Sequence, residues 1–219
     1  MTPAAQPQAV RPEGTVAGIL CMVGFALTAP VMDSFAKATP AEVPVAQILA
    51  ARFGVQVVVL VPLALALGMG RWPAPRDWGR HLIRSLLLLI ATGCFFSALR
   101  FMPIANALAI FFVAPFVITI LGGLLLGEDV GWRRLAACAV GFLGALLVIQ
   151  PSFADLGAVA LLPLGTAVCF ALYMILTRRM AQDAHPVALQ AWTALAACAV
   201  MLPLLWGFEG SGLAVLDPV

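Results

Sequence analysis

The stretch Arg100–Pro151 decides the fold, and it reads RFMPIANALAIFFVAPFVITILGGLLLGEDVGWRRLAACAVGFLGALLVIQP. No charged residue occurs between Ile104 and Leu126, and a second uncharged run extends from Leu135 to Ile149. A membrane-spanning helix needs about 20 mostly apolar residues, because each residue rises about 1.5 Å and the hydrocarbon core is about 30 Å thick. The stretch therefore predicts a hairpin of two membrane helices joined by a short charged turn at residues 127–134.

The composition of the whole chain agrees with a membrane protein. Of its 219 residues, 63% are hydrophobic and 10% are charged, and the mean hydropathy is +1.06. Soluble domains usually carry about 25% charged residues. The net charge of +2 is too small to indicate a nucleic-acid partner. We therefore expect an all-α integral membrane protein whose surroundings are the lipid bilayer.

Apolar runs predict seven transmembrane helices, near residues 15–34, 44–69, 82–99, 104–126, 135–149, 156–177 and 187–208. Residues 1–13 are polar and proline-rich, which is typical of a disordered tail. With the N-terminus in the cytoplasm, nine of the twelve Lys and Arg residues fall on the cytoplasmic side, as topology rules require. The sequence predicts a multi-pass protein of the cell inner membrane with a cytoplasmic N-terminus.

An internal repeat divides the chain. Four short matches recur in the same order at an offset of about 142 residues. We interpret 14–151 as a five-helix repeat and 152–219 as the start of a second one with two helices. A unit with an odd number of helices enters the membrane from the opposite side in its second copy, which predicts an inverted repeat typical of transporters. We expect this chain to be an incomplete copy that lacks three helices and does not transport alone. The matches pair 25–27 with 170–172, Lys37 with Arg179, 44–46 with 186–188, and 61–63 with 202–204.

Several short motifs together resemble the EamA family of the drug/metabolite transporter superfamily. The resemblance covers about residues 14–208. It implies a ten-helix transporter of small metabolites with a central cavity between two repeats, and it does not name the substrate. The motifs are Asp33–Lys37, Gln47–Arg52, Ala98–Pro103, Ala105–Ala107, Pro115, Leu126–Glu128, and Gly141 and Gly144 before Pro151.

Two charged residues within apolar runs are the first candidates for a substrate-binding or coupling site. Arg52 lies about eight residues into its predicted helix, roughly 12 Å from the outer end. A charge at this depth is costly and marks a functional site, although an arginine can also extend its side chain to the headgroups. Asp33 can pair with Lys37 one turn later, or with Arg52 across helices, or simply end its helix at the interface.

Further polar and aromatic residues extend this candidate set. Gln47 shares a helix with Arg52, and Asn106 either binds substrate or caps the start of the fourth predicted helix. Aromatic side chains in apolar runs either line a cavity or pack helix against helix. The aromatic candidates are Phe96, Phe111, Tyr173 and Trp192.

These features favour a transporter, in the export direction, for small metabolites such as amino acids or amphipathic compounds, working by alternating access between the repeats. The alternative is a non-transporting membrane subunit or remnant, and a homodimer is possible. An intramembrane enzyme is disfavoured because both histidines fall in predicted cytoplasmic connections and Asp33 has no second carboxylate near it at membrane depth. The cysteine and histidine spacings predict no metal site, and we expect no cofactor.

Overall fold

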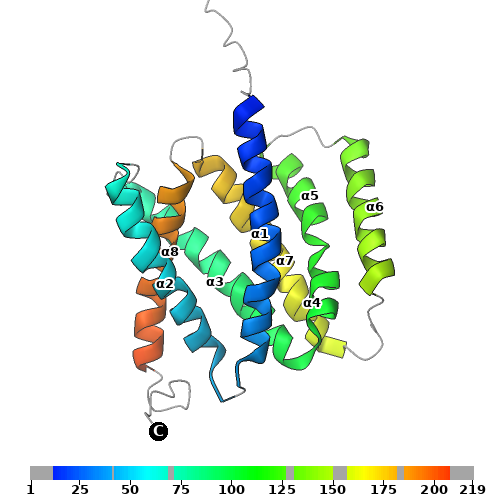
Figure 1. Cartoon of the computed structure of the whole chain (residues 1–219), viewed down its shortest axis with the longest axis horizontal. Helices are drawn as coiled ribbons and strands as arrows, with labels where there is room; N and C mark the ends of the chain where they lie inside the picture. The colour runs from blue at the N-terminus through cyan, green and yellow to red at the C-terminus, as the bar shows by residue number, and fades with distance from the viewer. Residues whose placement is uncertain are drawn as a thin grey trace, which may run out of the picture.

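The computed structural model describes residues 12–40, 42–68, 72–126, 131–149, 157–181 and 185–207, and every regular element in these ranges is a helix (Figure 1). The predicted tail therefore lies mostly outside the described residues. The elements are α1 (Pro12–Ala38), α2 (Val45–Ala66), η1 (Pro75–Asp77), α3 (Trp78–Phe101), α4 (Ile104–Phe111), α5 (Ala114–Leu126), α6 (Trp132–Ile149), η3 (Gly157–Ala160), α7 (Leu161–Met180) and α8 (Pro186–Gly207).

Five segments of the described chain are long and apolar enough to cross a bilayer. Large apolar side chains such as Leu20, Phe35 and Val58 point outward and are more than half exposed, which suits contact with lipid acyl chains rather than water. The protein is therefore a multi-pass helical membrane protein. The five segments are Val45–Ala66, Pro75–Phe101, Ile104–Leu125, Gly157–Met180 and Pro186–Pro203.

Two helix boundaries differ from the sequence-based expectation in ways that matter for the site. Helix α1 continues to Ala38, so Lys37 lies in its last turn and not in a loop. Helix α3 begins at Trp78, four residues earlier than expected. The expectation that His81 belongs to a cytoplasmic connection was wrong, because His81 lies in the first turn of α3 and its side chain is buried. Arg84, about one turn later, is also buried. In the sequence, charged residues in the first turns of a helix resemble a connecting loop. Only the tertiary structure shows that another helix covers them.

The fourth predicted helix is interrupted in its middle. Helix α4 ends at Phe111 and α5 begins at Ala114, so Ile104–Leu125 crosses the bundle as two pieces. Pro115 explains the break, since it has no N–H for the carbonyl of Phe111 and its ring would collide with that carbonyl. The chain instead makes a tighter turn, in which the Val113 N–H donates to the carbonyl of Ile110 at 3.1 Å.

The later helices also begin and end slightly differently from the prediction. Helix α6 begins at Trp132 instead of Leu135. The next span opens with the 3₁₀ turn η3 and continues as α7 to Met180, so Arg179 lies within the helix. Arg179 donates to the carbonyl of Leu125 in the last turn of α5. A cation at a helix C-terminus satisfies free carbonyls and opposes the negative end of the helix dipole.

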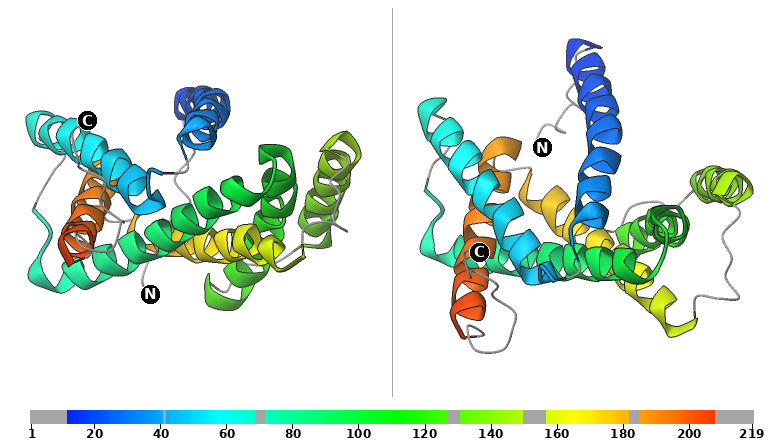
Figure 2. Two further views of the ribbon diagram at one scale, coloured as in Figure 1. Left: turned by 90° about the horizontal axis from the view of Figure 1, so that it is seen from below. Right: turned by 60° about the horizontal axis from the view of Figure 1, so that its bottom comes forward.

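Helix α3 forms the centre of the molecule. It packs most extensively along α7, while α2 packs along α8 and α3 also contacts α8. Figure 2 shows α1 and α2 on one side of α3 and α6 at the far edge. Helices on both sides of the proposed repeat boundary thus share one core, which includes Leu49, Phe53, Leu88, Leu89, Tyr173, Ala194, Ala197 and Met201.

Candidate functional site

Helices α1 and α2 bring the two predicted membrane charges, Asp33 and Arg52, near each other. Asp33 lies in the last turns of α1 and is only 8% exposed, while Arg52 is the eighth residue of α2 and is half-buried. Their charges interact electrostatically. Within the described residues they form no direct ion pair. The predicted pairing of Asp33 with Arg52 is therefore present as a longer-range electrostatic interaction and not as a salt bridge.

The guanidinium of Arg52 lies between aromatic rings. Its central carbon is 5.9 Å from the ring centre of Phe53 and 5.7 Å from that of Phe96 on α3, distances at which a cation is attracted to an aromatic ring. Its Nε is buried, and none of the described residues accepts a hydrogen bond from it. A buried donor without a partner is costly, so this edge of the guanidinium is suited to a ligand.

Gln56 adds a second polar group that the sequence analysis missed. Its Oε1 is also buried and has no partner among the described residues. Gln56 follows Arg52 by four residues, which places both side chains on one face of α2. This i, i+4 spacing of two polar residues in an otherwise apolar run was the available sequence signal.

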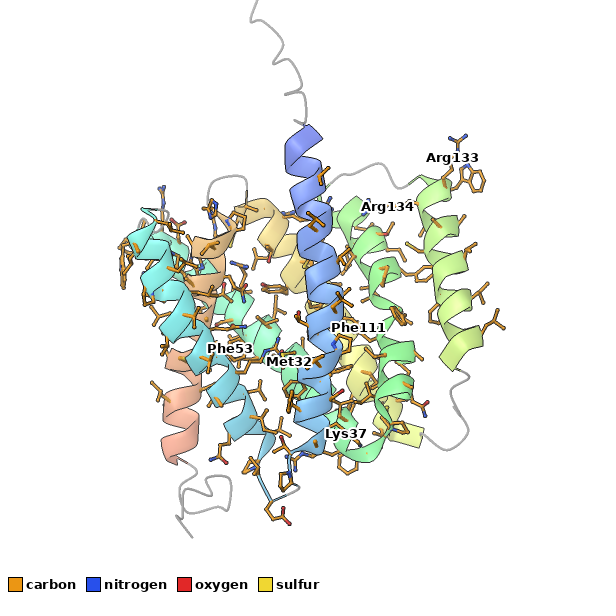
Figure 3. All side chains as sticks on the ribbon, in the orientation of Figure 1. Met32, Lys37, Phe53, Phe111, Arg133 and Arg134 are labelled. Atoms are coloured by element: carbon orange, nitrogen blue, oxygen red, sulfur yellow. The ribbon has the colours of Figure 1, made fainter. Side chains whose placement is uncertain are left out.

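Lys37 has a different position from Asp33. Its ammonium donates to the carbonyls of Leu99 and of Met102, the latter at 3.2 Å, at the C-terminal end of α3. Figure 3 shows Lys37 near the opposite end of the bundle from Arg133. We interpret Lys37 as a cap for α3 that fixes the C-terminal end of α1 against it.

Arg84 is a second buried arginine that sequence reasoning did not single out. It is 1% exposed, and its three hydrogen bonds all go to neutral groups of α7 and α8. Nε donates to the Thr177 hydroxyl at 3.2 Å, Nη1 to the Leu189 carbonyl at 3.2 Å and Nη2 to the Tyr173 hydroxyl at 3.3 Å. Arg84 therefore joins three helices at one point.

Tyr173 connects the two arginines. Its ring lies 5.1 Å from the guanidinium carbon of Arg84, and its hydroxyl donates to Oε1 of Gln190 at 3.0 Å. Tyr173 also lies within electrostatic range of Arg52. Four polar groups therefore form one polar set. Asp33 on α1, Arg52 on α2 and Tyr173 on α7 interact electrostatically, and Tyr173 directly contacts Arg84 in the first third of α3.

The aromatic candidates separate into two groups. Phe111 stacks edge-on against Phe170 with ring centres 5.5 Å apart, and Phe170 lies 6.0 Å from Tyr173. Phe96 therefore lies beside Arg52, and the pair of Phe111 and Phe170 meets the polar set at Tyr173. Trp192 is not among them, because it contacts Trp72 and Trp78 at ring distances of 4.8 and 6.4 Å. That cluster borders His81 at the start of α3.

The two remaining polar candidates, Gln47 and Asn106, lie at the starts of α2 and α4. Gln47 is half-buried in the first turn of α2 and does form a side-chain interaction. Asn106 is half-buried in the first turn of α4. Helix α4 starts after Pro103, and no side chain caps it, so the geometry does not support the capping role considered for Asn106.

Fold and site together define a polytopic helical membrane protein with charged groups held inside its bundle. The sequence profile of the EamA-like transporter family matches residues 16–150. The chain belongs to this family, as its motifs indicated.

Three curated relatives show the range of the family. The chain is 28% identical to a riboflavin transporter of Vibrio cholerae over 172 residues, which are 77% of the chain and 58% of the relative. It is 25% identical over 153 residues to an S-adenosylmethionine uptake transporter of Rickettsia prowazekii, covering 70% of the chain and 52% of that protein. The pseudopaline exporter CntI of Pseudomonas aeruginosa is 26% identical over 192 residues, covering 86% and 66%.

One solved crystal structure is also similar. It superposes with a TM-score of 0.62 at 25% identity, covering 86% of this chain and 68% of the other. The chain spans about half to two thirds of the length of the relatives above. The relatives are named as transporters of small molecules and not as enzymes.

Proposed function

We propose that the protein transports a small metabolite, amino-acid-like or amphipathic, across the inner membrane, and that the Arg52 site binds it. The observation that carries the proposal is the buried Nε of Arg52, which lacks a partner in the described structure, beside the equally unpartnered Oε1 of Gln56. Desolvating a charge inside a membrane protein is expensive, and such groups mark substrate or ion pathways. Phe53 and Phe96 supply an apolar lining at the same place.

The position of the site suits alternating access. Arg52 and Asp33 belong to the first proposed repeat, and Tyr173 belongs to the second. A rocking motion of one repeat against the other would change the distance between these groups and so expose the site to each side in turn. Export is supported by the similarity to the pseudopaline exporter, which covers a larger share of this chain than the other two relatives do.

The basic residues support a cytoplasmic N-terminus. Figure 3 shows Arg133 and Arg134 at one end of the bundle and Lys37 at the other. The two arginines belong to the segments with an excess of basic residues, so their end is the cytoplasmic one. The site around Arg52 then lies in the outer half of the membrane.

Vesicles provide the test. Because the chain is expected to lack three helices, the membrane vesicles, inside-out and right-side-out, would contain the chain completed by the last three helices of a full-length family member. They would be assayed with a panel of amino acids, flavins and S-adenosylmethionine, with the oligomeric state recorded in parallel. We expect saturable accumulation in inside-out vesicles that Arg52→Ala reduces by about ten-fold or more while expression is unchanged. Arg76→Ala, at an exposed position, is the matched control. A normal rate with Arg52→Ala would contradict the proposal, and an absence of flux with every compound would favour a non-transporting subunit.

A further inference from the structure

The charged side chains inside the described part of the bundle do not balance. Among the described residues, four charged side chains are not exposed: Asp33, Arg52, Asp77 and Arg84. Asp77 lies at the start of α3 and forms an ion pair with the exposed Arg80 at 3.5 Å. The remaining three groups leave one positive charge in excess.

The charge of Arg84 is not neutralised by its hydrogen-bond partners. Its three partners are a threonine hydroxyl, a backbone carbonyl and a tyrosine hydroxyl, all of them neutral. These bonds involve all three of its nitrogen atoms but do not cancel its charge. Among the described residues, the electrostatic partner of the buried Asp33 carboxylate is Arg52. Tyr173 contacts Arg84 and lies within electrostatic range of Arg52, so the surplus positive potential extends over the region that includes both arginines.

An excess positive charge in surroundings of low dielectric constant strongly attracts an anion. Phe53 and Phe96 flank the guanidinium of Arg52 and exclude water, so charges there are weakly screened. The edge of the group that lacks a partner is the buried Nε side, from which an arginine can donate two parallel hydrogen bonds to a carboxylate or phosphate. The amide of Gln56, one turn away, can meet a further polar atom of the same ligand.

We infer that the ligand of this site carries a negatively charged group, a carboxylate or a phosphate, which binds the Nε edge of Arg52 and balances the buried positive charge. This inference rests on the proposed function for the identity of the site. Arg84 acts as a positioning residue: through Tyr173 it holds the second wall of the site and adds to the potential that attracts the anion.

Matched probes test the inference without a known substrate. The purified chain in lipid nanodiscs would be titrated by calorimetry with 3-phenylpropionate, with its uncharged isostere 3-phenylpropanamide, and with phenyl phosphate. The two anions distinguish a carboxylate from a phosphate site. We expect at least one anion to bind at least about ten-fold tighter than the amide, which corresponds to about 1.4 kcal/mol.

Variants assign the binding to this site. Arg52→Gln should abolish the preference for the anion, and Arg52→Lys, which keeps the charge but loses Nε, should retain part of it. Asp33→Asn removes the competing carboxylate and should tighten anion binding several-fold. Arg76→Gln, an exposed residue, should change nothing.

Three outcomes would overturn the inference: equal affinity for amide and carboxylate, an unchanged preference in Arg52→Gln, or no saturable binding of either anion up to about 10 mM. Binding and transport remain separable. Anion binding without flux in vesicles would contradict the proposed function and leave the inference intact. Saturable flux of an uncharged compound, with no anion binding, would overturn the inference alone.

Discussion

The hydroxyl of Tyr173 provides the sharpest test of the core that joins α3 to α7 and α8. Tyr173→Phe keeps the aromatic ring, and with it the 5.1 Å contact to the Arg84 guanidinium. It removes two hydrogen bonds, one accepted from Arg84 at 3.3 Å and one donated to Gln190 at 3.0 Å. The substitution therefore isolates the contribution of the hydroxyl from that of the ring.

The expected cost follows from those two bonds. Hydrogen bonds between membrane helices contribute about 0.6 kcal/mol on average and up to about 1.7 kcal/mol. Two average bonds give about 1 kcal/mol, and two strong ones about 3 kcal/mol. Because one donor is a charged, fully buried arginine whose loss of a partner is costly, we expect about 2 kcal/mol.

Reversible unfolding in mixed detergent micelles, followed by circular dichroism, would measure the change. Thr119→Val is the matched control, since its buried hydroxyl bonds only to the Pro115 carbonyl of its own helix at 2.8 Å, and it should cost less than about 0.5 kcal/mol. A double-mutant cycle with Gln190→Leu should show a coupling of about 1 kcal/mol. A loss in Tyr173→Phe no larger than that of the control would refute the assignment of Tyr173 as the link between the helices.

Three further predictions concern other parts of the fold. Lys37→Met removes the cation from the free carbonyls at the end of α3 and should lower the free energy of unfolding by about 1 kcal/mol. Lys37→Arg should retain most of this stabilisation, and equal losses in the two variants would contradict the capping role. A Cβ added at Gly165 would lie 4.0 Å from Sγ of Cys94, an ordinary contact. Thermal unfolding should therefore show that Gly165→Ala is tolerated, while Gly165→Leu overpacks the α3–α7 interface and costs about 1–3 kcal/mol, and equal melting temperatures would count against this packing. Reporter fusions should read cytoplasmic at two sites and external at two others, and cytoplasmic signal at both external sites would reverse the topology. The cytoplasmic sites follow Arg76 and Arg179, and the external sites follow Thr39 and Gly212.

The sequence by itself was sufficient for the family and for the helical membrane class. Uncharged runs of about 20 residues have few alternatives to a spanning helix, because a bilayer leaves no partner for free backbone groups. The same reasoning singled out Arg52 and Asp33, since charges are rare at that depth. The inverted repeat, the seven spans and the cytoplasmic N-terminus stay predictions.

Only the tertiary structure decided which polar side chains meet. Arg84 and His81 follow a basic connection and look exposed in the sequence, but α7 and α8 cover them. Lys37 resembled a partner for Asp33, yet the end of α3 supplies carbonyls nearer to its ammonium. Hydrophobicity reports how a segment partitions into the membrane. It does not distinguish a helix face that contacts lipid from one that contacts protein. The neighbours of a buried charge come from helices distant in the sequence, so the site around Arg52 became visible only once those helices were packed together.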